Sequence, residues 1–100
     1  MDYRSEWSTR ALSKLRSIIA RLSERDPDAA QRLQVSIYEK IAFLRSFPFL
    51  AEVYQRVAEG EIRETQVGSY RIFYLVSASE PIIRILRIQH VRMNDPDWGE

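Results

Sequence analysis

The chain has 100 residues, of which 45% are hydrophobic and 29% are charged, and its formal net charge is +1. This length corresponds to a single domain, residues 1–100, with enough apolar side chains for a core. The near-neutral charge excludes a global electrostatic field directed at nucleic acid. The absence of cysteine excludes disulfides and thiolate metal sites.

The sequence lacks the usual signals for transport to or across a membrane. Its first ten residues are polar, which argues against a signal peptide. No apolar run approaches the about 20 residues that a membrane-spanning helix needs. We therefore expect a cytoplasmic protein without a membrane partner, and we expect no cofactor and no metal.

The N-terminal half is predicted to form a short strand and two helices. Residues 1–7 alternate weakly, and Ser8 or Thr9 suits the N-cap of a first helix. Apolar residues then recur at the spacing of one helical face, namely Ala11, Leu12, Leu15, Ile18, Ile19 and Leu22. Asp26-Pro27-Asp28 ends this helix and starts a second one. The second helix is expected to run to about Ser46, before Pro48, so that the two form an antiparallel hairpin.

Basic side chains are concentrated on the first helix, off its apolar face. They are Arg10, Lys14, Arg16, Arg21 and Arg25, and between Glu6 and Glu24 every charged residue is positive. One interpretation is a basic surface for nucleic acid or for an acidic partner. The other, which is the commoner case, is an ordinary solvated helix face.

Residues 47–60 have no clear period, and we expect a loop there. Phe47, Phe49 and Leu50 are predicted to pack this loop onto the body, and residues 51–58 have room for a short helical turn. Residues 61–67 then alternate modestly and predict a strand.

Residues 67–76 form the most strand-like stretch of the sequence, because Val, Ile, Tyr and Phe dominate it. Tyr70, Ile72, Tyr74 and Val76 fall on one face, and Arg71, Phe73 and Leu75 fall on the other. A second apolar run, residues 81–90, follows after a four-residue break, so the two predict an antiparallel hairpin. Residues 91–100 are a polar tail that Trp98 is expected to anchor.

The predicted architecture is α+β, in the order β-α-α-β-β-β. An N-terminal helical hairpin packs on one face of a small, mainly antiparallel sheet. Nothing else in the chain is expected to cover the other face, which would be open for a partner or a substrate.

The common catalytic motifs are absent, since there is no Gly-rich phosphate loop, no nucleophile elbow and no His/Cys metal set. The candidate residues lie on the last three predicted strands or just beyond them, namely Arg63, Arg71, Arg87, His90 and Arg92. If Arg63 and Arg71 share the open face, they can flank a phosphate, with His90 as acid or base. The alternative is that the arginines are solvated edge charges or bind an acidic partner, and that the lone histidine is structural.

Residues 67–76, followed by the run from Ile82 to Arg92, resemble the RelE/ParE superfamily of bacterial toxins. The hallmark of that superfamily is a Tyr-Arg-Ile-x-Tyr strand and a following strand that ends in an Ile-x-His-x-Arg-like run. The Ala11-Leu12-x-x-Leu15 helix and the Ile62-Arg63 strand match as well. The resemblance covers almost the whole chain in the same element order.

The resemblance implies the toxin half of a type II toxin–antitoxin pair, with a cognate antitoxin as its partner. The antitoxin neutralises the toxin and commonly supplies the DNA-binding part, so direct specific DNA binding is not expected of the toxin alone. RelE-like members cleave mRNA on the ribosome. ParE-like members inhibit DNA gyrase and are not nucleases.

Carried over to this chain, Arg71 matches the arginine that lies near the scissile phosphate in ribonuclease members. His90 or Arg92 stands near the second basic position. Glu64 occupies a position where those enzymes tend to have lysine, and the tail offers Asp95, Asp97 and Trp98 where they often have a catalytic Tyr or His.

These departures, and the His90-x-Arg92 ending, favour the gyrase inhibitor over a ribosome-dependent, metal-independent endoribonuclease. A ribonuclease would use Arg71, His90 and Arg92 as catalytic residues. In either case the partner- or phosphate-binding residues are expected to be Arg63, Arg71, Arg87 and Trp98. A non-toxic protein-interaction domain is the third possibility.

Overall fold

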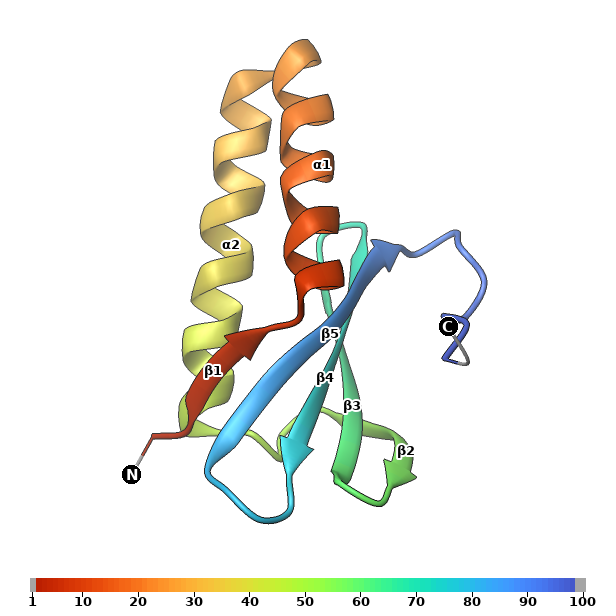
Figure 1. The fold of residues 1–100 in the computed structure, drawn as a ribbon. Coiled ribbons are helices and arrows are strands. Elements are labelled where there is room, and N and C mark those ends of the chain that lie inside the picture. Colours follow the sequence, from red (N-terminus) through yellow and green to blue (C-terminus); the bar gives the residue numbers. More distant parts are fainter. Residues whose placement is uncertain (1, 99–100) are drawn as a thin grey trace.

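The computed structural model describes residues 2–98, which form two helices and one five-stranded sheet (Figure 1). The elements are β1 (Arg4–Trp7), α1 (Thr9–Arg25), α2 (Pro27–Ser46), β2 (Glu52–Val57), β3 (Gly60–Val67), β4 (Tyr70–Ser77) and β5 (Ile82–His90). The strand order is β1-β5-β4-β3-β2. β1 runs parallel to β5, and the other neighbours are antiparallel. The predicted α+β class, with a helical hairpin on a mainly antiparallel sheet, is confirmed.

The turn between the two helices consists of Asp26 alone. Its backbone N–H donates to the Leu22 carbonyl at 2.8 Å and so completes α1. Its carboxylate accepts from the Ala29 N–H at 3.1 Å and so caps α2, of which Pro27 is the first residue. One residue therefore serves as C-cap and N-cap, and the helices are held antiparallel (Figure 1).

The start of α1 is fastened to the sheet by its own N-cap. The Ser8 hydroxyl accepts from the Ala11 N–H at 3.0 Å and donates to the Leu86 carbonyl of β5 at 3.2 Å. The predicted cap is confirmed, and it also fixes the position of α1 over β5. In the described part of the chain neither helix is long and apolar enough to cross a membrane.

The core lies between the helices and one face of the sheet. It contains Ala11, Leu15, Ile37, Ile41, Leu44, Val67, Ile72, Tyr74, Val76, Ile83, Ile85 and Ile88. The predicted division of β4 is confirmed, because Ile72, Tyr74 and Val76 face the helices. The phenol of Tyr74 is fully buried and donates to the Pro48 carbonyl at 2.9 Å. Burial raises the pKa of Tyr74 to about 12.

The prediction of a loop over residues 47–60 was wrong in two respects. Residues 52–57 form β2, an edge strand that pairs antiparallel with β3. A bulge between Val53 and Gln55 interrupts the alternation that would otherwise mark a strand. Phe47, Phe49 and Leu50 do not pack inward, since they are 54%, 55% and 67% exposed.

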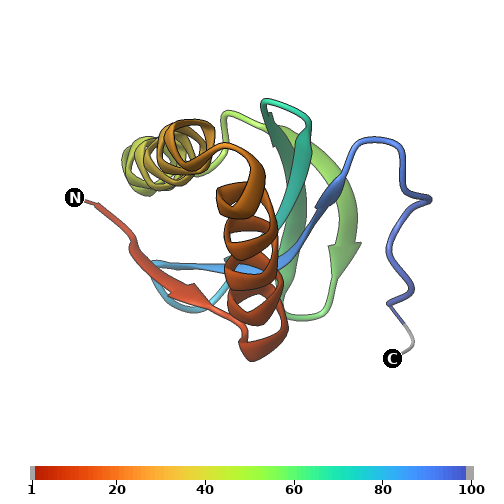
Figure 2. The same ribbon diagram turned by 90° about the horizontal axis from the view of Figure 1, so that it is seen from above.

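The second face of the sheet is not left open, which corrects another expectation. Seen from above, the helices lie on one side of the sheet and the C-terminal tail lies on the other (Figure 2). The tail, residues 91–98, leaves the end of β5, turns and runs back along this second face. The tail therefore covers part of the sheet face that was predicted to be open for a partner or a substrate.

Candidate functional site

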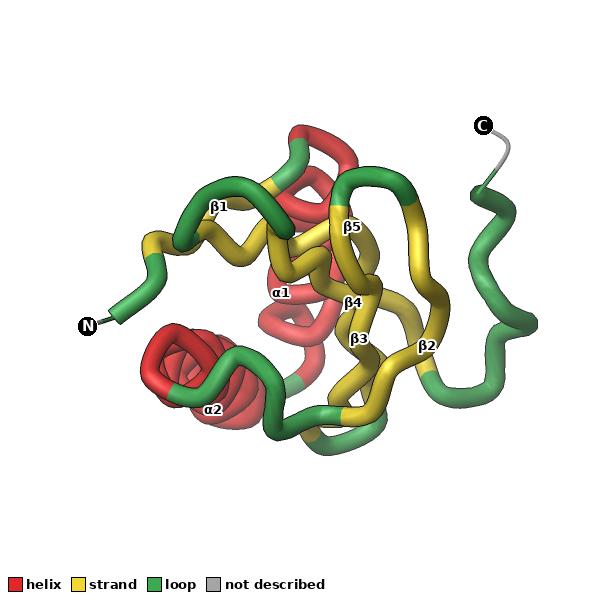
Figure 3. Tube along the Cα trace, turned by 90° about the horizontal axis from the view of Figure 1, so that it is seen from below, coloured by secondary structure: helices red, strands yellow, loops and turns green. Residues whose placement is uncertain are grey.

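The candidate site is the sheet face away from the helices, which we call the tail face. The strand register places Glu64 opposite Phe73, Phe73 opposite Arg87, and Arg71 opposite Gln89. Because paired residues point to the same side of a sheet, these five side chains share one face. Figure 3 shows that the tail lies on this side, away from both helices.

Arg71 lies near the centre of the tail face, and two carboxylates engage it. Its Nε donates to Glu64 at 2.7 Å, and its Nη2 donates to Asp95 at 2.9 Å. Its guanidinium carbon also lies 4.8 Å from the centre of the Phe73 ring. The hydrogen bond to Glu64, more than any other interaction, raises the pKa of Arg71 above its ordinary value. The charge of this arginine is therefore balanced within the chain.

Asp95 is the point at which the tail is fastened to the sheet. Besides the bond from Arg71, it accepts a hydrogen bond from the Tyr54 hydroxyl of β2 at 3.1 Å. These two bonds, with that of Arg71 the larger, lower the pKa of Asp95. Next to it, the Gln89 amide donates to the Asn94 carbonyl at 2.5 Å. The tail is thus tied to three strands.

Trp98 completes the attachment, as predicted. Its ring centre lies 5.6 Å from that of Phe73 and 5.9 Å from that of Tyr54. The Arg87 guanidinium carbon lies 4.9 Å from the Trp98 ring, a cation–π geometry. Arg71 and Arg87 therefore flank a pair of packed aromatic rings, Phe73 and Trp98.

Arg63 does not share a face with Arg71, so the condition for a two-arginine phosphate site is not met. Its register partner Tyr74 belongs to the core on the helix side of the sheet. The Arg63 guanidinium bonds to Glu61 at 2.6 Å and to the carbonyls of Phe49 and Ala51. Arg63 closes the connection from α2 to β2.

His90 also lies on the helix side of the sheet. It pairs with Tyr70, and the two rings are 5.5 Å apart in an edge-to-face arrangement. Its Nδ1 accepts from the backbone N–H of Arg92, which is exposed just beyond β5. Of the residues predicted from the sequence, the tail face brings together Arg71, Arg87 and Trp98, but not Arg63 and His90.

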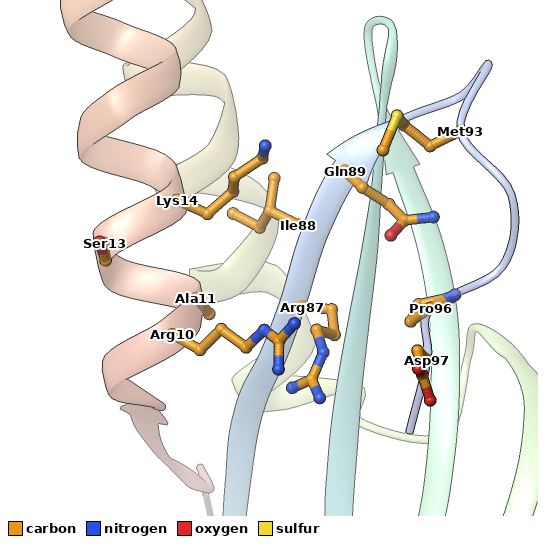
Figure 4. A pocket seen from close by; sticks show the side chains of 10 residues that line it. All are labelled: Arg10, Ala11, Ser13, Lys14, Arg87, Ile88, Gln89, Met93, Pro96 and Asp97. Carbon is orange, nitrogen blue, oxygen red and sulfur yellow. The ribbon is translucent and has the colours of Figure 1, made fainter. Parts of the chain in front are cut away.

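Arg87 also lines a cavity of about 380 Å³ between α1, β5 and the tail (Figure 4). Burial lowers the pKa of Arg87, and the positive charge of nearby Arg10 lowers it further. Arg10 and Lys14 reach this cavity from α1, and Asp97 reaches it from the tail. Two like charges are thus held close together at its edge.

Tyr54 and Gln89 are site residues that sequence reasoning missed. Tyr54 was overlooked because residues 47–60 were interpreted as a loop. The Val53-Tyr54 pair and Val57, which are all good strand formers, were the available signal. Gln89 was not recognised because it is a single polar residue in an apolar strand, although it pairs with Arg71 of the neighbouring strand.

The tail face is suited to binding, because it combines a paired arginine with packed aromatic rings. Arg71 has Glu64 and Asp95 as partners, and the hydrogen bond from Arg71 lowers the pKa of Asp95 and so favours its charged form. The histidine that would supply an acid or base lies on the opposite face. Within residues 2–98 no group of three or more potential metal ligands gathers either.

Solved structures with the same fold are toxin–antitoxin complexes. The archaeal RelE–RelB complex from Pyrococcus horikoshii OT3 aligns over 94% of this chain and 100% of its own, with 18% identity and a TM-score of 0.67. The chromosomal ParDE system from P. aeruginosa aligns over 88% and 95%, with 18% identity and a TM-score of 0.67. The RelBE2 complex from Mycobacterium tuberculosis aligns over 90% and 99%, with 20% identity and a TM-score of 0.59. At these identities the likeness establishes the fold.

No curated protein matches the sequence significantly. The sequence does match a family model, described as "ParE toxin of type II toxin-antitoxin system, parDE", over residues 5–95. That match extends from β1 to Asp95, so it includes the helical hairpin, the sheet and the part of the tail that bonds to Arg71. The chain therefore belongs to the ParE toxin family of type II toxin–antitoxin systems, within the RelE/ParE superfamily.

Proposed function

We propose that this chain is a toxin that inhibits DNA gyrase by binding it, and that a cognate antitoxin neutralises it. The proposal is for a binding protein without nuclease chemistry, acting in the cytoplasm. The membership in the ParE family supports the gyrase target, and the toxin–antitoxin complexes among structures of the same fold support the antitoxin partner.

The observation that carries the proposal is the pairing of Arg71 with two carboxylates of the same chain. Metal-independent cleavage of RNA needs a free cation beside the phosphate and an acid and a base within reach of the reacting oxygens. Here Arg71 is bonded to Glu64 and Asp95, and His90 lies on the other side of the sheet. A phosphate would have to displace Asp95 and would still meet the negative charge of Glu64.

The alternative is a ribosome-dependent mRNA endoribonuclease in which Arg71 stabilises phosphate charge. It requires that the tail move away, because Asp95 lies on the tail beyond β5, whereas Glu64 is fixed within β3. His90 and Arg92 would then act from the end of β5. This alternative makes a different prediction for the first process to fail in a cell.

The test is expression of the chain alone in a bacterial host, with thymidine and methionine incorporation followed in parallel. We expect DNA synthesis to fall first, followed by a DNA-damage response. The purified chain should also inhibit supercoiling by purified gyrase. A Glu59→Gln variant, which changes one exposed charge away from the tail face, serves as the control for expression and folding.

The result that would overturn the proposal is an earlier fall in methionine incorporation, with cuts in a reporter mRNA that disappear in an Arg71→Lys variant. If neither label falls while the folded chain accumulates, gyrase inhibition is equally excluded. The remaining hypothesis is then a non-toxic protein-interaction domain.

A further inference from the structure

Four cations of the sheet form ion pairs with acids of the same chain, namely Arg56, Arg63, Arg71 and Arg84, whereas no cation of α1 does so within the described residues. Arg63 pairs with Glu61 at 2.6 Å, and Arg84 pairs with Glu6 at 3.2 Å. Within residues 2–98 there is no ion pair or side-chain hydrogen bond for four basic residues of α1, namely Arg10, Lys14, Arg21 and Arg25. None of the four therefore has a carboxylate within ion-pairing distance among the described residues.

These four residues, which we call the α1 stripe, lie along one side of the helix. Their spacing of four, seven and four residues keeps them within about 60° of the helix circumference over a length of about 22 Å. All four are exposed. Arg16, the remaining cation of the helix interior, points about 150° away from the centre of the stripe.

The first half of the stripe borders the 380 Å³ cavity. Arg10 and Lys14 of α1 face Arg87 of β5 across it, and the side chains of Arg10 and Arg87 point toward one another (Figure 4). Buried Ala11 and Ile88 line it as well. Among the lining residues Asp97 is the single acid, so three cations face one carboxylate.

The second half of the stripe borders a smaller hollow of about 60 Å³. Lys14, Arg21 and Arg25 surround it. Its apolar lining comes from Ile18, Leu22 and Tyr70. Because Lys14 borders both hollows, the two form one continuous track along α1.

We propose that the α1 stripe is the docking surface for an acidic, amphipathic segment of the antitoxin. Carboxylates of that segment would lie on the four cations, and its apolar side chains would fill the two hollows. The proposal rests on the proposed function for the identity of the partner. An extended segment of about seven residues spans the stripe.

The apolar lining is the reason to choose an acidic peptide over a nucleic acid. A phosphate backbone is held by cations alone and gains nothing from Ile88, Ile18 or Leu22 beneath them. A peptide with apolar residues among its acids gains from both, because burial of apolar surface adds to the ionic contacts.

The test is a binding measurement on the purified full chain by fluorescence polarisation. The probe is a labelled twelve-residue peptide of Glu and Leu. Comparison probes are a Lys/Leu peptide, a Glu/Ser peptide and a twelve-nucleotide poly-dT strand. The variant is Lys14→Glu, at the position that borders both hollows, and the matched control is Arg16→Glu, which makes the same change in charge on the same helix.

We expect Lys14→Glu to weaken binding of the Glu/Leu peptide about tenfold and Arg16→Glu to weaken it less than about twofold. The Glu/Ser and Lys/Leu peptides should bind more weakly than the Glu/Leu peptide. If Lys14→Glu does not fold by circular dichroism, Arg21→Gln and Arg16→Gln are the second matched pair.

Equal losses in the two variants would overturn the proposal, because binding would then follow net charge. Equal binding of the Glu/Ser peptide, or tighter binding of poly-dT, would also overturn it. The assay contains no gyrase, so its outcome is independent of whether the chain inhibits that enzyme.

Discussion

The guanidinium of Arg71 donates a 2.9 Å hydrogen bond to the carboxylate of Asp95, which lies 24 residues further along the chain. This bond joins the central strand of the sheet to the C-terminal tail. Together with the bond from Tyr54 to the same carboxylate, it places Trp98 on Phe73. The position of the tail and the ion pairing of Arg71 are therefore linked.

The first prediction concerns the fastening of the tail. Asp95→Asn removes the negative charge that Arg71 and Tyr54 hold, so the tail should detach more often while the sheet stays folded. In a Trp7→Phe background, where Trp98 is the remaining tryptophan, acrylamide should quench its fluorescence more strongly in Asp95→Asn. Glu59→Gln should leave the quenching unchanged, and an unchanged Asp95→Asn would show that Trp98 holds the tail alone.

The same contact predicts release of the tail in acid. The bonds from Arg71 and Tyr54 lower the pKa of Asp95 below its ordinary value of 3.8. Because the pKa of Asp95 is lower in the folded state, its ionised carboxylate stabilises the attached tail at any pH above the ordinary pKa. This stabilisation is lost as the pH falls through the pKa of the folded state. Quenching of Trp98 should therefore rise below pH 3.8, and Asp95→Asn should not show this rise.

The second prediction concerns the Arg71–Glu64 pair, whose donor and acceptor atoms are 2.7 Å apart. Arg71→Lys keeps the charge but cannot donate to two carboxylates from one planar group, so it should cost about 1 kcal/mol in urea unfolding. Arg71→Gln should cost more, because Glu64 and Asp95 then lie together without a cation. Glu64→Gln should recover part of that loss, and simple additivity of the two changes would contradict a direct interaction.

The third prediction is a loss of stability in alkali. Burial raises the pKa of Tyr74 to about 12 from an ordinary value of 10.0. Folding thus favours the neutral phenol of Tyr74. Its contribution to the free energy of unfolding is complete below pH 10 and is lost as the pH rises toward 12. This shift corresponds to about 3 kcal/mol. Unfolding in urea at pH 8 and at pH 11.5 should show the loss for the wild-type chain.

Tyr74→Phe is the control for that measurement. It should cost about 1 kcal/mol at neutral pH, because the hydrogen bond to the Pro48 carbonyl is lost. Its stability should then fall less between pH 8 and pH 11.5 than that of the wild type. An identical fall in both would assign the alkaline transition to other groups.

The fourth prediction compares two glycines in left-handed backbone conformations. Gly60 has a φ of 152°, and a Cβ there would lie 2.0 Å from the Val76 carbonyl oxygen of β4. Gly68, with a φ of 56°, has no atom within 4 Å of such a Cβ. Gly68→Ala should cost about 1 kcal/mol from backbone strain alone. Gly60→Ala should cost clearly more, as measured by thermal unfolding, and equal losses would contradict the close approach.

The secondary structure was largely predictable because its signals are local. The apolar spacing of residues 11–22 predicts α1, and the caps at Ser8 and Asp26 determine where the two helices begin. The alternation in residues 70–76 predicts which side chains of β4 enter the core. These features depend on neighbours within a few residues along the chain.

The edge strand β2 shows where local signals were insufficient. Its bulge at Val53/Gln55 breaks the two-residue period, and its pairing with β3 supplies the order that its own sequence does not specify. Local signals were also insufficient to place Arg63 and Arg71 relative to each other. Whether they share a face depends on the register between β3 and β4, and that register places them on opposite sides.

The sequence by itself therefore determined the order of the elements other than β2, the helical hairpin, the core face of β4 and the resemblance to the RelE/ParE superfamily. The tertiary structure alone decided that Arg71 is bonded to Glu64 and Asp95, that His90 lies on the other face, and that the tail occupies part of the second face of the sheet. The physical reason is distance along the chain. Helix and strand patterns reflect interactions between near neighbours, whereas the Arg71–Asp95 bond depends on the path of a polar tail without any periodicity of its own.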